Sequence, residues 1–201
     1  MGSNRITNQT ALAQLSVASF FAGIGGFDLG FERAGLKVGW QCEISPFCRD
    51  ILQQHWSDVP LAEDIREIKA EELPDADVWT GGFPCQDVSV ARMGPRKGLR
   101  GKQSGLFYRF AELIEARRPA TVVIENVSGL LSSHGGRDFQ IVISTLAQFG
   151  YGVAWRVLNS RYFGVPQSRQ RVFIVACHRD AGRAGDVLFE SERGKGDAKG
   201  S

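Results

Sequence analysis

Residues 17–34 of this chain read VASFFAGIGGFDLGFERA, and the order of residue types in this stretch decides the fold class. VASFFA has the length and composition of a buried strand, whereas FDLGFERA places its apolar residues on one face of a helix. Gly23, Gly25 and Gly26 stand between the two segments. A strand that runs through a glycine-rich turn into a helix is typical of the ligand-binding edge of an α/β sheet.

The same alternation continues along the chain. Amphipathic segments separate apolar runs that suit strands, and these runs occupy residues 37–43, 78–83, 121–126, 151–159 and 171–179. We therefore expect an α/β fold with a doubly wound, mainly parallel sheet, helices on both faces and a site along the carboxyl ends of the strands. Residues 1–16 and 181–201 are polar or rich in glycine and charge, and we expect both to be tails.

Composition excludes several classes of protein. The 201 residues are 43% hydrophobic and 23% charged, with a formal net charge of +2, which is globular composition. Four cysteines without a CxxC pair and three histidines without ligand spacing predict neither a zinc site nor a disulfide framework. No apolar run approaches the roughly 20 residues of a membrane span. We expect a reduced, cytoplasmic protein with no metal and no membrane contact.

Charge is unevenly distributed along the chain. Acidic residues dominate residues 43–77, whereas residues 88–111 contain six basic residues and no acid. Residues 139–179 contain five arginines and are likewise free of acids. One part of the molecule is therefore predicted to face a polyanion.

The glycine turn favours a nucleoside as ligand. The dinucleotide pattern requires a third glycine, which is replaced here by Asp28, so a nucleoside without phosphates fits better. Glu43 ends the second apolar run, where a carboxylate can accept bonds from two ribose hydroxyls, and Asp64 can accept a bond from an adenine amino group. The alternative is that both are ordinary surface acids.

The segment GGFPCQ at residues 81–86 places Cys85 on a loop shaped by glycine and proline, beside a basic run. This position suits a thiolate of lowered pKa that acts as a nucleophile. A buried structural cysteine is the alternative for Cys85, and it is the interpretation that we keep for Cys42, Cys48 and Cys177.

Two further groups follow apolar runs. Glu125 ends the run TVVI at the same predicted sheet edge as Cys85, where a carboxyl group can hold or share a proton, although it can also serve as a structural or capping acid. Arg169 and Arg171 precede the run VFIVAC and project to one side if the backbone is extended; their alternative role is as solvated surface charges.

Taken together and in order, these pieces resemble the cytosine-5 DNA methyltransferase family. The motifs are FAGIGG, the acid of CEI, the aspartate of EDIREI, GGFPCQ, SGLF, ENV and QSRQR, and they extend over residues 17–179. The resemblance implies a Rossmann-like fold typical of S-adenosylmethionine-dependent methyltransferases. It also implies an incomplete catalytic domain at residues 17–180, followed at 181–201 by the start of a target-recognition region or a flexible tail.

The resemblance implies S-adenosylmethionine as the cofactor. The residues that match the family's cofactor site are Phe21, Ala22, Gly23, Gly25, Gly26, Glu43, Asp64 and Pro84. It also makes Cys85 the nucleophile that adds to carbon-6 of cytosine, because carbon-5 is a poor nucleophile until electron density is pushed across the ring. Glu125 would bind ring nitrogen-3, and Arg171, supported by Arg169, would lie near the base carbonyl.

Double-stranded DNA is the implied partner, with the target cytosine flipped out of the stack. The residues expected to contact DNA are Gln86, Ser89, Arg92, Arg96, Lys97, Arg100 and Lys102. Two positions depart from the family pattern: Ser19 stands where many members have an aspartate, and Gln103 stands where an arginine is common. These departures are expected to weaken contacts without abolishing the site.

The family normally continues beyond QxRxR into a target-recognition region and a helix that completes the cofactor pocket, so we expect an exposed apolar seam here.

Besides the enzyme, we keep the alternative of an inactive, truncated or split-subunit module that needs a second subunit carrying the target-recognition region. RNA as the substrate is a third interpretation, and a dinucleotide oxidoreductase is the last.

Overall fold

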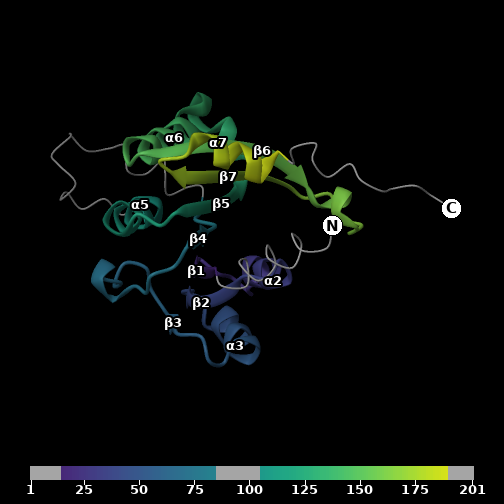
Figure 1. The fold of residues 1–201 in the computed structure, drawn as a ribbon. Helices are drawn as coiled ribbons and strands as arrows, with labels where there is room; N and C mark the ends of the chain where they lie inside the picture. The colour runs from purple at the N-terminus through teal and green to yellow at the C-terminus, as the bar shows by residue number, and fades with distance from the viewer. Residues whose placement is uncertain (1–14, 85–104, 190–201) are drawn as a thin grey trace, which may run out of the picture.

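The computed structural model describes residues 15–84 and 105–189. Its centre is a seven-stranded sheet with the strand order β3-β2-β1-β4-β5-β7-β6 (Figure 1). The strands are β1 (Ser16–Phe20), β2 (Lys37–Cys42), β3 (Leu61–Ala62), β4 (Val78–Gly81), β5 (Thr121–Val127), β6 (Tyr151–Asn159) and β7 (Gln170–His178).

The sheet is mainly parallel, as the sequence predicts. Strands β3, β2, β1, β4 and β5 pair in parallel, whereas β7 is antiparallel to both of its neighbours, β5 and β6. The carboxyl ends of the parallel strands therefore lie at one edge. Since β7 runs the other way, it begins at this same edge, and Arg171 pairs with Val127 at the end of β5.

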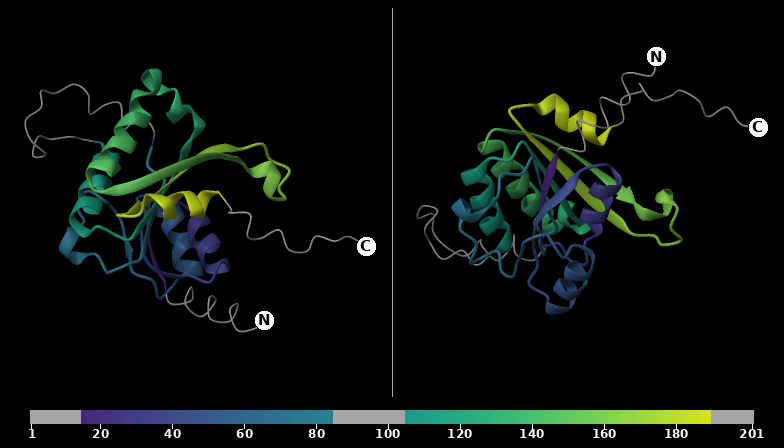
Figure 2. Two further views of the ribbon diagram at one scale, coloured as in Figure 1. Left: turned by 45° about the horizontal axis from the view of Figure 1, so that its top comes forward. Right: turned by 60° about the horizontal axis from the view of Figure 1, so that its bottom comes forward.

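Helices cover both faces of the sheet, which confirms the doubly wound architecture (Figure 2). Helices α5 and α6 lie on one face, and α2, α3 and α7 lie on the other. The helices are α2 (Gly26–Arg33), α3 (Pro46–His55), α5 (Leu106–Arg117), α6 (Arg137–Gln148) and α7 (Ala181–Leu188), with 3-10 turns η1 (Ala70–Glu72), η2 (Ser128–Leu131), η3 (Ser133–Gly136) and η4 (Ser160–Phe163).

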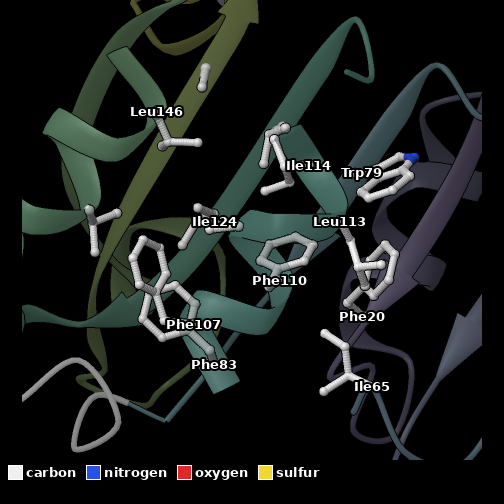
Figure 3. Packing of buried hydrophobic residues seen from close by; sticks show 14 of the residues in the cluster. Phe20, Ile65, Trp79, Phe83, Phe107, Phe110, Leu113, Ile114, Ile124 and Leu146 are labelled. Carbon is white, nitrogen blue, oxygen red and sulfur yellow. The ribbon is translucent and has the colours of Figure 1, made fainter. Parts of the chain in front are cut away.

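The main core lies between the sheet and helices α5 and α6 (Figure 3). Its centre is Phe20, whose ring lies 4.8 Å from that of Trp79 and 4.9 Å from those of Trp40 and Phe110. The side chains of β5 alternate between buried and partly exposed, so Val122 and Ile124 enter this core. Burial of this aromatic and aliphatic cluster fixes the central strands, whose carboxyl ends lie at the sheet edge described above.

Helix α7 corrects one expectation from the sequence. Residues 181–188 were expected to belong to a tail, but they form a helix that packs on β6 and β7. Asp180 caps the helix by accepting a hydrogen bond from the Arg183 amide at 2.9 Å, and Ala184 is fully buried beside Val175 and Cys177. Gly152 permits this packing, because a Cβ atom there would overlap Ala181. Residues 1–14 and 190–201 lie outside the described residues.

The turn between β1 and α2 depends on Gly25. Its φ angle is +86°, a left-handed conformation that glycine adopts without strain. A Cβ atom at this position would also overlap the ring of Trp56, at the end of α3, and would lie 3.1 Å from Leu52 Cδ2. Both the backbone and the packing therefore require glycine.

We predict that Gly25→Ala lowers the free energy of unfolding by about 2 to 4 kcal/mol, because it adds left-handed strain and overpacking. Urea unfolding of the full chain measures the change. Gly30→Ala is the matched control: Gly30 lies within α2 with nothing within 4 Å of a Cβ atom, so this change should stabilise the chain by about 0.5 to 1 kcal/mol. Equal stability of the two variants would contradict the prediction.

Candidate active site at the carboxyl edge of the sheet

Four strand ends meet at one edge of the sheet. Phe21 follows β1, Glu43 follows β2, Gly82 follows β4 and Glu125 lies near the end of β5. The antiparallel strand β7 adds Arg171, which is its second residue and pairs with Val127 of β5. The fold thus brings together predicted site residues from the first 45 residues of the chain and from positions beyond 120.

The glycine turn at residues 21–26 is an unusual piece of backbone. Phe21, Gly23 and Gly25 all have positive φ angles, of 54°, 57° and 86°. The Ala22 amide donates to the Cys42 carbonyl at 3.1 Å, and the Gly25 amide donates to the Ala22 carbonyl at 3.0 Å. This turn is therefore held against the end of β2, as a ligand-binding turn at a sheet edge requires.

Glu43 is the acid that holds the turn. Its Oε2 accepts a hydrogen bond from the Gly23 amide at 2.7 Å, and its Oε1 accepts one from the Ser45 amide at 2.8 Å. The residue is only 9% exposed, so its carboxylate is fixed in orientation. Each oxygen retains a lone pair for a further donor such as a ribose hydroxyl.

A narrow apolar cavity lies beside Glu43. The described residues that line it include Phe21, Glu43, Ile44, Asp64, Ile65 and Leu106. Three of these were predicted as cofactor residues from the sequence. Ile44, Ile65 and Leu106 were not, although they belong to the quoted motifs CEI, EDIREI and SGLF, and motif membership was the only available signal.

Asp64 enters this cavity as an ionised group. The guanidinium of Arg66 donates to both of its carboxylate oxygens, with Nε 2.9 Å from Oδ1 and 3.0 Å from Oδ2. This pair, together with the Arg66 amide, holds the pKa of Asp64 below its ordinary value. Asp64 is therefore an acceptor and not a donor at neutral pH.

Glu125 forms the second cluster of the site. Arg171 Nε lies 2.9 Å from Glu125 Oε1, and Arg169 Nη2 lies 3.9 Å from the same oxygen. Side-chain exposure is 24% for Glu125 and 21% for Arg171, but 52% for Arg169. Arg171 is therefore the closer partner in a partly desolvated pair, and Arg169 reaches outward.

A cavity of about 320 Å³ adjoins this ion pair. Its lining combines Glu125, Arg169 and Arg171 with the apolar side chains of Leu158, Phe163 and Phe173. The volume is at the lower end of the range that small ligands occupy. Such a lining offers both charged groups and apolar surface to a planar polar ring.

Two residues bring the loop after β4 close to Glu125. A Cβ atom on Gly82 would lie 3.4 Å from Glu125 Oε2, so the glycine permits a close approach. Asn126 is 3% exposed; its Nδ2 donates to the Phe83 carbonyl at 2.9 Å and its Oδ1 accepts from the Val127 amide at 2.9 Å. The sequence analysis did not select Asn126 as a site residue, although it directly follows Glu125.

The predicted nucleophile and DNA contacts cannot be placed. Pro84 is the last described residue of the loop and is exposed. Cys85 and the residues expected to contact DNA lie outside the described residues, namely Gln86, Ser89, Arg92, Arg96, Lys97, Arg100 and Lys102.

Two of the other cysteines, Cys42 and Cys177, are poorly suited to nucleophilic chemistry. Burial raises the pKa of the Cys42 thiol to about 12, and it also raises the pKa of Cys177. Both side chains are almost fully buried, so their thiolates are disfavoured. Within the described ranges, no group of three His, Cys, Asp or Glu side chains could hold a metal ion, and no helix is long and apolar enough to cross a membrane.

Trp56 is a further residue that the sequence analysis missed. Its ring packs on Gly25, and its indole Nε1 donates to Glu32 Oε1 of α2 at 2.8 Å. It thereby supports the glycine turn from the side of α3. Its only sequence signal is its place at the end of an amphipathic segment, which does not distinguish a core residue from a site residue.

Most of the chain is similar in sequence to known proteins. The family model described as C-5 cytosine-specific DNA methylase matches residues 15–195. The Type II methyltransferase M.Bsp6I of Bacillus sp. (strain RFL6) is 40% identical over 164 residues, which are 80% of this chain and 51% of that protein. M2.BsuMI of Bacillus subtilis (strain 168), also a Type II methyltransferase, is 37% identical over 190 residues, 92% of this chain and 47% of that protein.

Solved structures share the fold. The Dnmt2 methyltransferase of S. pombe has a TM-score of 0.69 at 23% identity, over 92% of this chain and 58% of that chain. The Entamoeba histolytica methyltransferase EhMeth has a TM-score of 0.61 at 19% identity, over 82% of this chain and 53% of that chain. The chain thus spans about half the length of the curated relatives that it matches.

We predict that Asn126→Ala lowers the free energy of unfolding by about 1 to 3 kcal/mol, because it leaves the buried Phe83 carbonyl and Val127 amide without their side-chain partner. Chemical denaturation of the full chain measures the loss. Val127→Thr, at the exposed neighbouring position, should change stability by about 0.5 kcal/mol or less. An Asn126→Ala chain as stable as the unaltered one would show that the hydrogen bonds of Asn126 to Phe83 and Val127 are dispensable for stability.

Proposed function

Because the chain belongs to the C-5 cytosine-specific DNA methylase family, we propose that it carries the chemical centre of a DNA (cytosine-5-)-methyltransferase. In this proposal a methyl group passes from S-adenosylmethionine to carbon-5 of a flipped cytosine, through a covalent adduct with Cys85. The observation that carries the proposal is the meeting of Glu125 and Arg171 with the loop that leads to Cys85, at the edge that also holds Glu43.

The residues present fit S-adenosylmethionine. Glu43 has acceptor capacity for ribose hydroxyls, the ionised Asp64 can accept an adenine amino group, and Ile44 and Ile65 supply apolar walls. The positive φ angles at Gly23 and Gly25 suit a backbone that approaches a ligand closely. The chemistry that the cofactor supplies when bound is an electrophilic methyl group on a sulfonium.

Activation of cytosine begins with Cys85 in this proposal. Its thiolate attacks carbon-6, a sulfur–carbon bond forms, and the ring electrons shift toward carbon-5 and nitrogen-3. Carbon-5 takes the methyl group from the sulfonium, which is left as a neutral thioether. A solvent water then accepts the carbon-5 proton, the carbon–hydrogen electrons re-form the ring double bond, and the sulfur leaves carbon-6 as thiolate. The double bond of the ring is thereby restored, and the enzyme is regenerated.

Glu125 and Arg171 would stabilise the negative charge that develops on the ring, Glu125 by donating a proton to ring nitrogen-3 and Arg171 by its positive charge. Arg171 occupies Glu125 Oε1, whereas Oε2 lies toward Gly82 and the loop that continues to Cys85. We therefore assign Oε2 to ring nitrogen-3, with the Arg171 guanidinium near the base carbonyl. Arg169, more exposed, would support Arg171 from the outer side of the cavity.

Binding of double-stranded DNA is part of the proposal. The reacting carbon lies inside the base stack, so the cytosine must be extruded into a pocket. The cavity beside Glu125 is of suitable size, and residues 139–179, which supply much of its wall, carry arginines and no acid. Gln86, Ser89 and the basic residues between 92 and 102 are proposed to contact the DNA backbone.

The runner-up is a module that needs a second subunit. It is favoured by one observation: the matched Bacillus relatives are about twice as long as the stretch they share with this chain. In that case the chain would keep the centre described above and would depend on a partner that carries the target-recognition region.

We predict that the purified full chain transfers labelled methyl from S-adenosylmethionine to cytosine-containing duplex DNA, and that Cys85→Ala reduces transfer to background. Glu125→Gln should lower the rate about 10² to 10³-fold, because an amide cannot donate the proton that ring nitrogen-3 takes as Cys85 adds. Cys48→Ala is the matched control and should leave the rate unchanged, since Cys48 lies on α3 away from Glu125.

Duplexes that carry 5-fluorocytosine test the adduct directly. Fluorine cannot leave carbon-5 as a proton does, so a covalent complex should accumulate with the unaltered chain and with Cys48→Ala, but not with Cys85→Ala. Transfer that survives in Cys85→Ala would overturn the mechanism. Methyl transfer to RNA in place of DNA would contradict the assignment of DNA as the substrate. Activity that appears only after the part of M.Bsp6I that this chain does not match is added as a separate chain would select the runner-up.

A further inference from the structure

A row of buried polar side chains crosses the centre of the sheet beneath α2. Strand register aligns Ser19 of β1 with Gln41 of β2 on one side and with Thr80 of β4 on the other. All three are at most 1% exposed. Asp28, in the first turn of α2, projects onto this row and is fully buried. None of these four residues touches the proposed chemistry, so the function described above does not explain them.

Asp28 ties three elements together. Its Oδ2 accepts a hydrogen bond from Ser19 Oγ at 3.1 Å, and its Oδ1 accepts one from Gln41 Nε2 at 2.9 Å. No lysine, arginine or histidine among the described residues forms an ion pair with it. A buried carboxylate without a cation is costly, which favours the neutral acid.

The surroundings of Asp28 agree with a neutral carboxyl group. Burial raises its pKa; the hydrogen bonds from Gln41 and Ser19 act in the opposite direction but are smaller causes, and the nearby Glu32 adds to the rise. Gln41 Oε1 and Thr80 Oγ1 are buried without a hydrogen-bond partner in the described structure. If the Gln41 amide turns over, its Oε1 can accept the proton of a neutral Asp28.

The place of Asp28 in the fold links it to the glycine turn. It lies three residues after Gly25, whose carbonyl accepts the Leu29 amide at 2.9 Å. Its partner Gln41 lies two residues before Glu43, which holds the Gly23 amide. The ends of β1, β2 and α2 that form the seat of the turn are therefore joined at one carboxyl group.

The turn needs such an anchor because its conformation is strained. Phe21 has a positive φ of 54°, which is unfavourable for a residue with a Cβ atom, and two further left-handed residues follow it. A strained turn persists only where its surroundings hold both of its ends. Trp56 supports the outer side of the turn, and Asp28 secures the helix that leaves it.

We propose that Asp28 is a positioning residue that holds the turn at residues 21–26 in its binding conformation through Ser19 and Gln41. The inference rests on the proposed function in one respect: the ligand of this turn is S-adenosylmethionine. Asp28 does not touch that ligand and acts only by fixing where α2 begins.

Amide hydrogen exchange of the full chain tests the proposal without any ligand. The probes are the amides of Gly23, Gly25 and Leu29, each hydrogen-bonded within or next to the turn. We expect Asp28→Ala to accelerate their exchange about tenfold or more relative to amides of β5. Asp28→Asn, which keeps an acceptor and adds a donor for Gln41 Oε1, should restore exchange to within about twofold of the unaltered chain.

Val142→Ala is the control for a merely structural role. Val142 is fully buried on α6, on the opposite face of the sheet, so its truncation lowers global stability without touching the turn. At matched global stability, only Asp28→Ala should expose the turn amides selectively. Equal acceleration in Asp28→Ala and Val142→Ala, or failure of Asp28→Asn to rescue, would overturn the proposal.

Titration calorimetry with S-adenosylmethionine extends the test to binding. We expect Asp28→Ala to weaken affinity about tenfold or more, whereas Val142→Ala and Asp28→Asn should bind nearly as the unaltered chain does. If the unaltered chain binds no S-adenosylmethionine, the proposed function fails, while amide exchange still decides the role of Asp28.

The free energy of unfolding, measured as a function of pH, adds a test to which a change in packing alone would not contribute. A raised pKa in the folded state means that the stabilisation from neutral Asp28 is present at low pH and is lost as pH rises through that pKa. Among the described residues, Glu32 on the same helix is the charged group that raises the pKa of Asp28, and its hydrogen-bond partners Ser19 and Gln41 are uncharged. Asp28→Asn should remove this loss; the same pH profile in both chains would contradict the neutral acid.

Discussion

The antiparallel entry of β7 beside β5 is the constraint on which the site depends. Pairing of Val127 with Arg171 brings the start of β7 to the edge where the parallel strands end. Arg171 then meets Glu125 at 2.9 Å, although 46 positions separate them in the chain. If β7 ran parallel to β5, its first residues would lie at the opposite edge, and the arginines would not meet Glu125.

A second constraint acts on the glycine turn at the same edge. The turn after β1 adopts left-handed angles that only packing can maintain, and three contacts supply this packing: Glu43 binds its Gly23 amide, Trp56 covers Gly25, and Asp28 secures α2. Ser19 has a defined role here as well, since its hydroxyl donates to Asp28. The departure from the family pattern at Ser19 is therefore accompanied by a carboxyl group that reaches the same place from the helix.

Sequence patterns predicted much of this arrangement because they are local. Strand–turn–helix alternation gave the α/β class, and the position of Glu43 and Glu125 directly after apolar runs placed both at the carboxyl edge. Helix α7 was missed because residues 181–188 contain two glycines, an aspartate and a β-branched valine among only eight residues. Its stability comes from the Asp180 cap and from Ala184, which packs against Val175 and Cys177; no local pattern reports such contacts.

The sequence by itself determined the family, the order of strands and turns along the chain, and the residue types available for binding and catalysis. Tertiary structure alone decided which of those residues meet: Arg171 and not Arg169 as the close partner of Glu125, Asn126 as the tether of Phe83, and Trp56 as the cover of Gly25. The physical reason is that side-chain chemistry and backbone periodicity are encoded locally. Contacts between distant residues depend on strand direction, register and burial, which exist only once the sheet has formed.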